Sequence, residues 1–277
     1  MKIKMFTGVF ILVLTFSAAH SATFRYSAQN QWPGICVTGN TGRQSPINII
    51  TDEVVEENDL TALRFSSEYT SPIEGEFENT CQNVEFTPQN TVNAFMRTLI
   101  GTYKFLQFHF HWGRQSGEGT EHLVDGTAEE FEVHFVHKNV FGMDPSAGDA
   151  LAVLAVRGKA VSRSIEDSED IWEELDASQI STVDADIDVE NIIMTDLFPN
   201  NRDYYYYEGS LTTPDSDETV QWFVYKNLIE VPRAYLDNLR KIERDASGNL
   251  LTFNFRAPQE LNNHPVLCFE EEDVSLK

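Results

Sequence analysis

Histidines and aromatic residues alternate in one short segment of the chain, at a spacing that could hold a metal ion. Residues 107–112 read QFHFHW, so polar and aromatic side chains alternate strictly. Successive side chains of a β-strand point to opposite faces, and the alternation therefore predicts a strand with Gln107, His109 and His111 on one face. Two imidazoles placed two residues apart on one strand face can converge on a single ion.

A second segment repeats this arrangement. Residues 130–137 read EFEVHFVH, which places Glu132 and His134 on the same face of a second predicted strand. If the two strands are neighbours, His109, His111 and His134 form a site with three nitrogen ligands. Zinc suits such a site, because it prefers tetrahedral coordination, accepts imidazole and leaves a fourth position to water.

The same strands offer partners that could orient the ligands. Gln107 and Glu132 each precede a histidine by two residues on the same face, where they can accept the N–H of its other ring nitrogen and fix its tautomer. A single strand histidine is more often a satisfied core residue than a ligand. Three histidines on matched faces, each strand with a polar neighbour, favour a metal site.

Short strands must position these residues. Stretches typical of β-structure, separated by turn residues, occur at 83–87, 104–112, 130–137, 150–156, 219–225 and 250–255. Helical spacing of apolar residues is confined to 164–175 and 232–242. We therefore expect a mainly β fold with a few short helices, built as a single domain.

Composition limits the class of protein. The chain has 277 residues with 44 Asp and Glu against 20 Lys and Arg, a formal net charge of −24. Its 41% of hydrophobic residues is enough for a substantial core and argues against intrinsic disorder. The acidic balance argues against a nucleic-acid binder, whose surface is basic. Acidic enzymes, cation-binding matrix proteins and storage proteins remain open.

The N-terminus has the pattern of a secretory signal peptide. Residues 1–21 combine a basic start, an apolar run and small residues, with cleavage expected after Ala19 or Ser21. The apolar run is too short to cross the roughly 30 Å hydrocarbon core of a bilayer. We expect a secreted, extracellular protein without a membrane anchor, whose mature domain covers residues 22–277.

Three motifs resemble those of the α-class carbonic anhydrases. They are the two histidine segments together with Glu121-His122, residues 42–49 (GRQSPINI) and residues 209–214 (GSLTTP), in the order that the family has them. The resemblance runs from about Tyr26 to about Phe269. It implies one domain around a large, mostly antiparallel twisted β-sheet with a conical active site, and reversible hydration of carbon dioxide to bicarbonate and a proton by hydroxide on zinc.

The resemblance also implies roles for individual residues. His109, His111 and His134 match the zinc ligands, and Gln107 and Glu132 match the residues that orient them. Thr212 matches a threonine that accepts a hydrogen bond from the hydroxide and donates one to a glutamate, here Glu121. The order of these bonds is fixed, because a hydroxyl both accepts and donates whereas a carboxylate only accepts.

Further positions match the substrate pocket of the family. Its residues here are Val136, Val153, Leu211, Val220, Trp222 and Thr213, and Tyr26 and Asn83 match polar positions that order water. Taken singly, each apolar residue of this set would be read as ordinary core. Inhibition by sulfonamides is expected as well.

Two features depart from the family pattern. Fast members carry a histidine that shuttles protons just before Asn83, but Thr80 stands there and threonine does not titrate near neutral pH. We therefore expect an active enzyme whose proton transfer is slowed. The second departure is Ser216, which replaces the cysteine that many secreted members pair with one near the start, here Cys36. Cys36 is then a free thiol, pairs with Cys81 or Cys268, or joins two chains in a disulfide-linked dimer.

The alternative to an enzyme is an acidic secreted matrix or storage protein on the same fold. Such a protein would use its surface carboxylates to bind cations such as calcium. Retention of all three ligand histidines together with Glu121 and Thr212 favours the enzyme.

Overall fold

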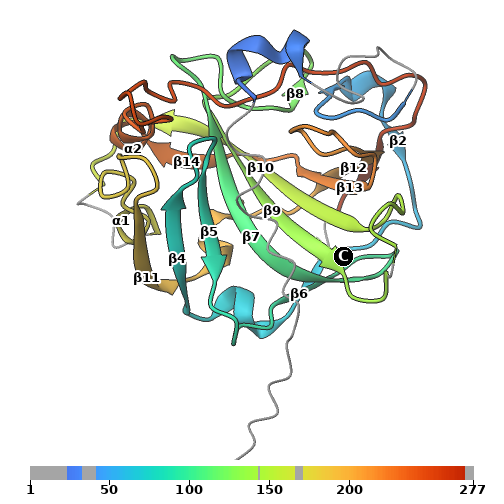
Figure 1. The fold of residues 1–277 in the computed structure, drawn as a ribbon. Coiled ribbons are helices and arrows are strands. Elements are labelled where there is room, and N and C mark those ends of the chain that lie inside the picture. The colour runs from blue at the N-terminus through green and yellow to red at the C-terminus, as the bar shows by residue number, and fades with distance from the viewer. Residues whose placement is uncertain (1–23, 33–41, 143, 166–170, 272–277) are drawn as a thin grey trace, which may run out of the picture.

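The fold consists mainly of β-strands (Figure 1). The computed structural model describes residues 24–32, 42–142, 144–165 and 171–271, so the predicted signal peptide and Cys36 lie outside the described residues. The strands are β1 Asn48–Ile49, β2 Val55–Glu56, β3 Arg64–Phe65, β4 Ile73–Asn79, β5 Val84–Pro88, β6 Phe95–Arg97, β7 Thr102–Trp112, β8 Leu123–Val124, β9 Phe131–Asn139, β10 Leu151–Val161, β11 Asp186–Ile192, β12 Tyr204–Gly209, β13 Val220–Tyr225, β14 Ile229–Pro232 and β15 Leu267–Phe269. The α-helices are α1 Ile171–Glu174 and α2 Arg233–Leu239, and the 3₁₀-helices are Tyr26–Gln31, Thr51–Glu53, Ser67–Thr70 and Met194–Leu197.

One large sheet organises the molecule. Its strand order is β11-β4-β5-β7-β9-β10-β13-β12-β15-β2, with β14 beside β10, β6 beside β7 and β3 beside β6. Most of these pairs are antiparallel, while β10 runs parallel to β13 and β14, and β15 runs parallel to β2. The expected mainly β, single-domain fold around a large and mostly antiparallel sheet is confirmed, and the parallel pairs make the sheet mixed.

Five of the six expected strand stretches are strands, and the prediction for 250–255 is wrong. There the backbone runs beside the end of β7, but the Asn254 side chain takes over the bonds of a ladder: its Nδ2 donates to Phe110 O (2.7 Å) and its Oδ1 accepts from Trp112 N (2.8 Å). The helix expected at 232–242 is present as α2, Arg233–Leu239. Within the helix expected at 164–175, residues Ile171–Glu174 form α1, and residues 166–170 lie outside the described residues.

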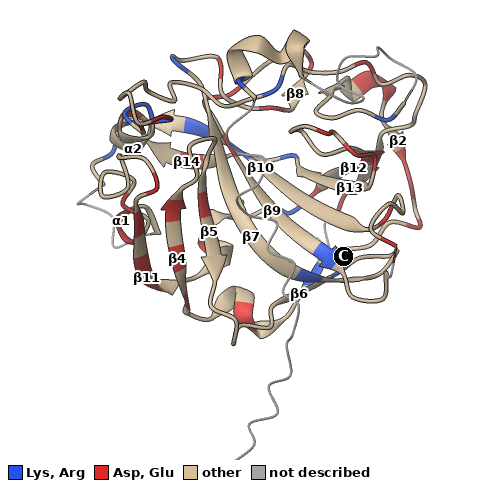
Figure 2. Ribbon diagram, in the orientation of Figure 1, with Lys and Arg blue, Asp and Glu red and all other residues tan. Residues whose placement is uncertain are grey.

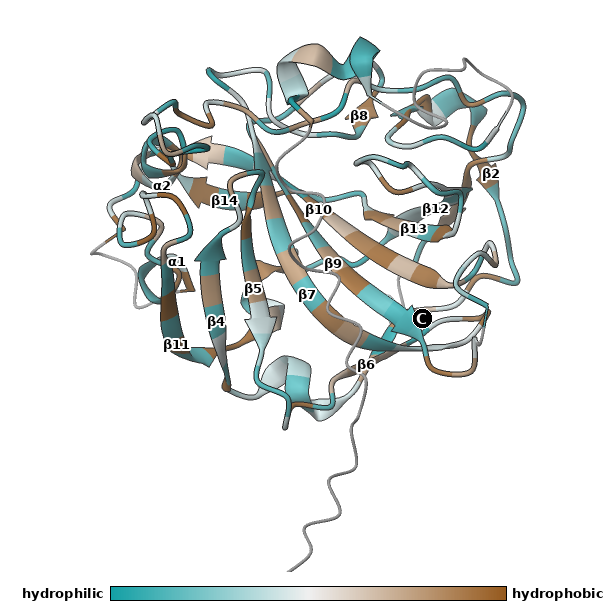
Figure 3. Ribbon diagram, viewed as in Figure 1, coloured by the Kyte–Doolittle hydropathy of each residue, from teal (hydrophilic) through white to brown (hydrophobic). Residues whose placement is uncertain are grey.

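The two faces of the central strands bury different side chains. One face is aromatic, with Phe86, Phe108, Phe110 and Phe135 fully buried in the larger hydrophobic cluster. The other face carries the histidines and a smaller hydrophobic cluster that includes Val153 and Trp222. Apolar residues are therefore frequent along β7, β9 and β10, as the brown stretches of Figure 3 show.

Segments from the two ends of the chain meet over one end of the sheet. Gln29 Nε2 donates to Phe255 O (2.9 Å), and Gln29 Oε1 accepts from Ala257 N (2.9 Å). In Figure 1 the blue and red segments accordingly run together along the top of the molecule. Among the described residues, none of the helices has both the length and the apolar character needed to cross a membrane.

Candidate metal centre

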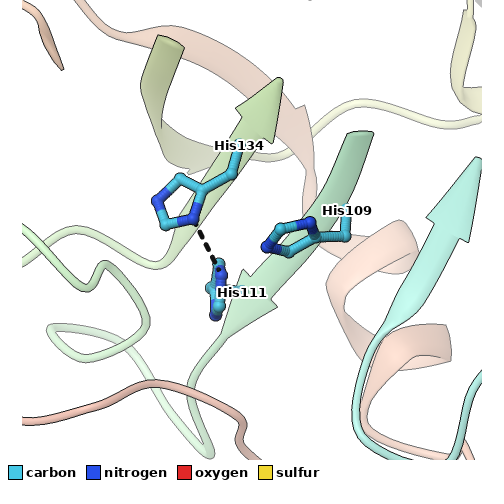
Figure 4. Close-up of side chains that lie close together, drawn as sticks. All are labelled: His109, His111 and His134. Carbon is cyan, nitrogen blue, oxygen red and sulfur yellow. Dashed lines mark hydrogen bonds between the residues drawn. The ribbon is translucent and has the colours of Figure 1, made fainter. Parts of the chain in front are cut away.

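Three histidines converge from neighbouring strands. The register of β7 and β9 pairs His109 directly with His134, and His111 lies two residues further along β7 on the same face. Figure 4 shows the three rings turned toward one another. His111 Nε2 lies 3.1 Å from His134 Nδ1, and one ring nitrogen from each histidine falls within a group whose members are all within 4.8 Å of one another.

The other nitrogen of each ring is held by a hydrogen bond. His109 Nδ1 donates to Gln107 Oε1 (2.9 Å), as expected from the sequence. His134 Nε2 donates to Glu132 Oε1 (2.7 Å), also as expected. His111 Nδ1 donates to the backbone carbonyl of Asn254 (2.7 Å). These bonds leave Nε2 of His109 and His111 and Nδ1 of His134 with their lone pairs free for a metal.

The electrostatics of the three rings also fit a cation. Burial, together with the other two histidines, holds the pKa of His109 well below its ordinary value. Burial lowers the pKa of His111 to about 4 and also lowers that of His134. The imidazoles are thus neutral at physiological pH, which is the form that binds metal. Three neutral imidazole nitrogens at this spacing fit zinc, which in catalytic sites takes three protein ligands and a fourth from water.

A buried hydrogen-bond network holds Glu132. His122 donates to this carboxylate from Nδ1 (2.6 Å) and from its backbone N–H (3.0 Å), and His122 Nε2 lies 2.8 Å from the Tyr207 hydroxyl. Burial alone would raise the pKa of Glu132, but His122 and His134 bring it well below the ordinary value. The group His122, Glu132 and His134 could be read as a second metal site. Because Glu132 accepts the ring protons of both histidines, we interpret the group as the support of the first site.

Glu121 is fully buried beside the ligand nitrogens. Its Oε2 lies 3.6 Å from His111 Nε2 and 3.9 Å from His134 Nδ1, and its Oε1 accepts from Arg256 N (2.7 Å). Burial raises the pKa of this carboxyl to about 7, against the lowering effects of His134 and of the nearby Thr212 side chain. Thr212 thus lies close to Glu121 and the histidines, while Glu121 Oε2 has no hydrogen-bond partner among the described residues.

The apolar residues predicted for the pocket lie one step along the same strands. Val136, Val153 and Trp222 stand opposite one another across β9, β10 and β13, two residues from the row that contains His134. Val220 belongs to the same cluster, and the partly buried Val136 and Leu211 pack against it. The Trp222 ring lies 4.8 Å from the His134 ring, centroid to centroid. The histidine cluster therefore has apolar side chains along one side.

The polar residues predicted around the site differ in their environments. The Thr80 hydroxyl donates to Asn83 Oδ1 (2.6 Å) and accepts from Asn83 N (3.1 Å), so it is fully engaged by its neighbour. Thr213 is half-buried. Tyr26 is buried, and burial together with the Glu121 charge raises the pKa of its hydroxyl.

Several supporting residues were not predicted from the sequence as part of the site. They include Asn254, Arg256 and Tyr207, whose contacts join segments far apart in the chain. Glu85 stands opposite His109 in the pairing of β5 with β7, and burial and the Glu78 charge raise its pKa to about 7. Cys81 and Cys268 are free thiols in the described part of the chain.

Comparison with known proteins gives one family. A sequence model of the eukaryotic-type carbonic anhydrases matches residues 27–270. The chain is 31% identical over 245 residues to putative carbonic anhydrase 3 of Caenorhabditis elegans, an alignment covering 86% of this chain and 92% of that protein. It is 31% identical over 249 residues to carbonic anhydrase 4 of Rattus norvegicus (87% and 79% covered) and 31% identical over 261 residues to carbonic anhydrase 1 of Mus musculus (89% and 98% covered).

Proposed function

Because the chain belongs to the eukaryotic-type carbonic anhydrase family, we propose that it catalyses the reversible hydration of carbon dioxide with a zinc ion held by His109, His111 and His134. The observation that carries this proposal is the hydrogen bonding of the three rings, which leaves one free nitrogen on each directed at a common point. We further propose that the protein is secreted, on the pattern of residues 1–21.

When bound, zinc supplies a Lewis acid that lets a water molecule lose its proton near neutral pH, the behaviour for which carbonic anhydrases are the reference case. The chain supplies the orientation. We propose that Thr212, which lies close to Glu121, donates its hydroxyl hydrogen bond to the unpartnered Glu121 Oε2. A carboxylate only accepts, and so the Thr212 oxygen would be left to accept a hydrogen bond from the nucleophile.

The apolar wall accounts for the choice of substrate. Carbon dioxide is small and has no net charge or dipole, so a pocket lined by Val136, Val153 and Trp222 can hold it beside the nucleophile without the cost of burying a charge. Bicarbonate is an anion, and apolar side chains do not stabilise its charge. The apolar wall therefore favours release of the product after each turnover.

The proposal is tested by measuring zinc content and carbon dioxide hydration on the same sample. Zinc equimolar with the protein, together with hydration that a sulfonamide abolishes, is the expected result. A protein that takes up no zinc and does not accelerate hydration would overturn the proposal in favour of the acidic matrix protein.

Proton transfer out of the site is expected to limit turnover in weak buffer. Thr80 has no titratable group, and its hydroxyl is engaged by Asn83. In Thr80→His a histidine would stand at this place and could carry the proton to solvent, since its pKa is near neutral. We expect turnover in weak buffer to rise by about 10-fold, part of the roughly 10²–10⁴-fold that a positioned proton-transfer group contributes. The measurement is the initial rate of hydration against buffer concentration.

The buffer dependence provides the control. An imidazole buffer should accelerate the unmodified protein and have little effect on Thr80→His. If the unmodified protein already turns over rapidly in weak buffer, the prediction is wrong and a different group accepts the proton. Glu85, whose pKa is about 7, would then be the first residue to replace.

A further inference from the structure

Four cations stand together on one face at one end of the sheet. Arg64 on β3 pairs directly with Arg97 on β6, and Lys104 on β7 pairs directly with Lys138 on β9. Residues directly opposite in antiparallel strands share a face, and the pairing of β6 with β7 places both pairs on the same one. In Figure 2 blue stretches lie where β6, β7 and β9 come together, whereas β4 and β11 carry red stretches.

These cations are not neutralised within the described part of the chain. Arg64, Arg97 and Lys138 are exposed and take part in none of the ion pairs found there. Lys104 is half-buried and donates to the neutral Asn93 Oδ1 (3.1 Å). Like charges directly opposite in a sheet are destabilising. Two such pairs without counter-ions, in a chain of net charge −24, point to an anionic surface outside the protein.

Large apolar side chains are exposed at the same end of the sheet. The described residues expose six such side chains, and four of them lie in the turns that flank β7 and β9: Leu99 (57% exposed), Ile100 (47%), Val140 (40%) and Phe141 (81%). Val140 N donates to Thr102 O (3.0 Å), which joins the two turns. Isolated exposed apolar residues are ordinary, but a group of four is typical of an interaction site.

Both turns are held in shape by a side chain at their base. Thr98 Oγ1 accepts from Ile100 N (3.1 Å), and Asn139 Oδ1 accepts from Phe141 N (3.0 Å). The apolar side chains therefore project from fixed turns.

We propose that this basic apolar edge, formed by the four cations and the four exposed apolar residues named above, binds the surface of an anionic phospholipid membrane. Projecting apolar side chains can enter the boundary between headgroups and acyl chains, and the cations beside them meet the lipid phosphates and carboxylates. Both halves of the surface are needed for such a partner. A soluble polyanion would use the cations and leave Phe141 in water.

Carboxylates also lie near this edge. Asp149 Oδ2 accepts from Asn139 Nδ2 (3.1 Å), next to Lys138, and Asp144 follows Phe141 by three residues. Neither carboxylate forms an ion pair with the four cations in the described part of the chain. The contact with a membrane therefore requires that the four cations outweigh these two acids, and it should weaken with salt.

The test is co-sedimentation of the full chain with vesicles of phosphatidylcholine alone and with equimolar phosphatidylserine. We expect binding to the anionic vesicles that weakens with salt. Lys104→Gln with Lys138→Gln should weaken it by about 25-fold, since each cation near an anionic surface contributes about 5-fold. Phe141→Ser should weaken binding by about 10-fold, for loss of partial burial of the ring.

Matched controls lie elsewhere on the surface. Lys159→Gln removes a half-exposed cation that pairs with Glu230, and Leu250→Ser removes an apolar side chain that is 46% exposed. Both should bind vesicles as the unmodified protein does. Absence of binding, binding that ignores Phe141→Ser, or competition by a soluble sulfated polysaccharide would overturn the proposal. So would a dimer, seen by sedimentation, that dissociates in Phe141→Ser while vesicles are not bound.

Discussion

Replacing His134 by alanine is expected to remove zinc binding and carbon dioxide hydration together. His134 is the only one of the three proposed ligands that comes from β9, and it faces both His109 and His111. Without it two nitrogens remain, and Glu132 loses a ring proton that it accepts at 2.7 Å. The loss of zinc affinity should exceed the roughly 10–100-fold that removal of an outer partner alone costs.

The result is read against a histidine that lies outside the site. His264→Ala removes a half-buried imidazole from the C-terminal segment and should leave the zinc content and the hydration rate unchanged. Circular dichroism and thermal unfolding establish that both variants are folded. If His134→Ala kept equimolar zinc and its activity, the three-histidine site would be wrong.

The convergence of the three histidines could be predicted because their pattern is local. Alternation with a period of two fixes which side chains of a strand share a face, whatever the strand packs against. The same reasoning gave Gln107 and Glu132, and the structure has both bonds. A bulge in β7 shifts the register between Phe105 and Gln107. The alternation still predicts the faces of the histidines correctly, because His109 and His111 both lie after the bulge.

The remaining parts of the site depend on contacts between distant segments. The partner of His111 is a backbone carbonyl 143 residues away, at Asn254, and any residue type offers a carbonyl. The apolar wall forms because β10 runs parallel to β13, which sets Val153 beside Trp222. Such pairings depend on the order of the strands in the sheet, and the alternation within a single strand does not predict that order. Resemblance to a family supplied the wall residues, and periodicity alone would have assigned them to the core.

The strand prediction at 250–255 failed for a related reason. The apolar pattern of that stretch is real, and Leu251 is buried. Its backbone nevertheless makes one bond to the end of β7, from Asn254 N to Trp112 O (3.2 Å), and the Asn254 side-chain amide makes the bonds to Phe110 O and Trp112 N. From the sequence, an asparagine whose side-chain amide bonds to the backbone of a neighbouring strand looks the same as any other polar residue.

Replacing Glu121 by glutamine is expected to stabilise the zinc-free protein and to impair the enzyme. Burial raises the pKa of this carboxyl from 4.5 to about 7, so between these pH values the folded state binds more protons than the unfolded state. The free energy of unfolding must then fall as the pH rises through this window. Above it the buried carboxylate costs about 3 kcal/mol. Glutamine has no charge to bury, and its oxygen can still accept from Arg256 N.

The variant should therefore match the unmodified protein below about pH 4.5 and exceed it by about 3 kcal/mol near pH 8, as measured by denaturant unfolding of zinc-free samples. Glu230→Gln, which removes an exposed carboxylate (59%), should leave this pH dependence unchanged.

Hydration by zinc-loaded Glu121→Gln should fall by about 100-fold, because the glutamine amide can itself donate and Thr212 then need not donate to it. A variant that is destabilised near pH 8, or one that keeps full activity, would show that Glu121 serves the fold and not the orientation of the nucleophile. A gain in stability together with a loss of activity in Glu121→Gln is the result expected if the buried charge of Glu121 destabilises the fold and serves catalysis.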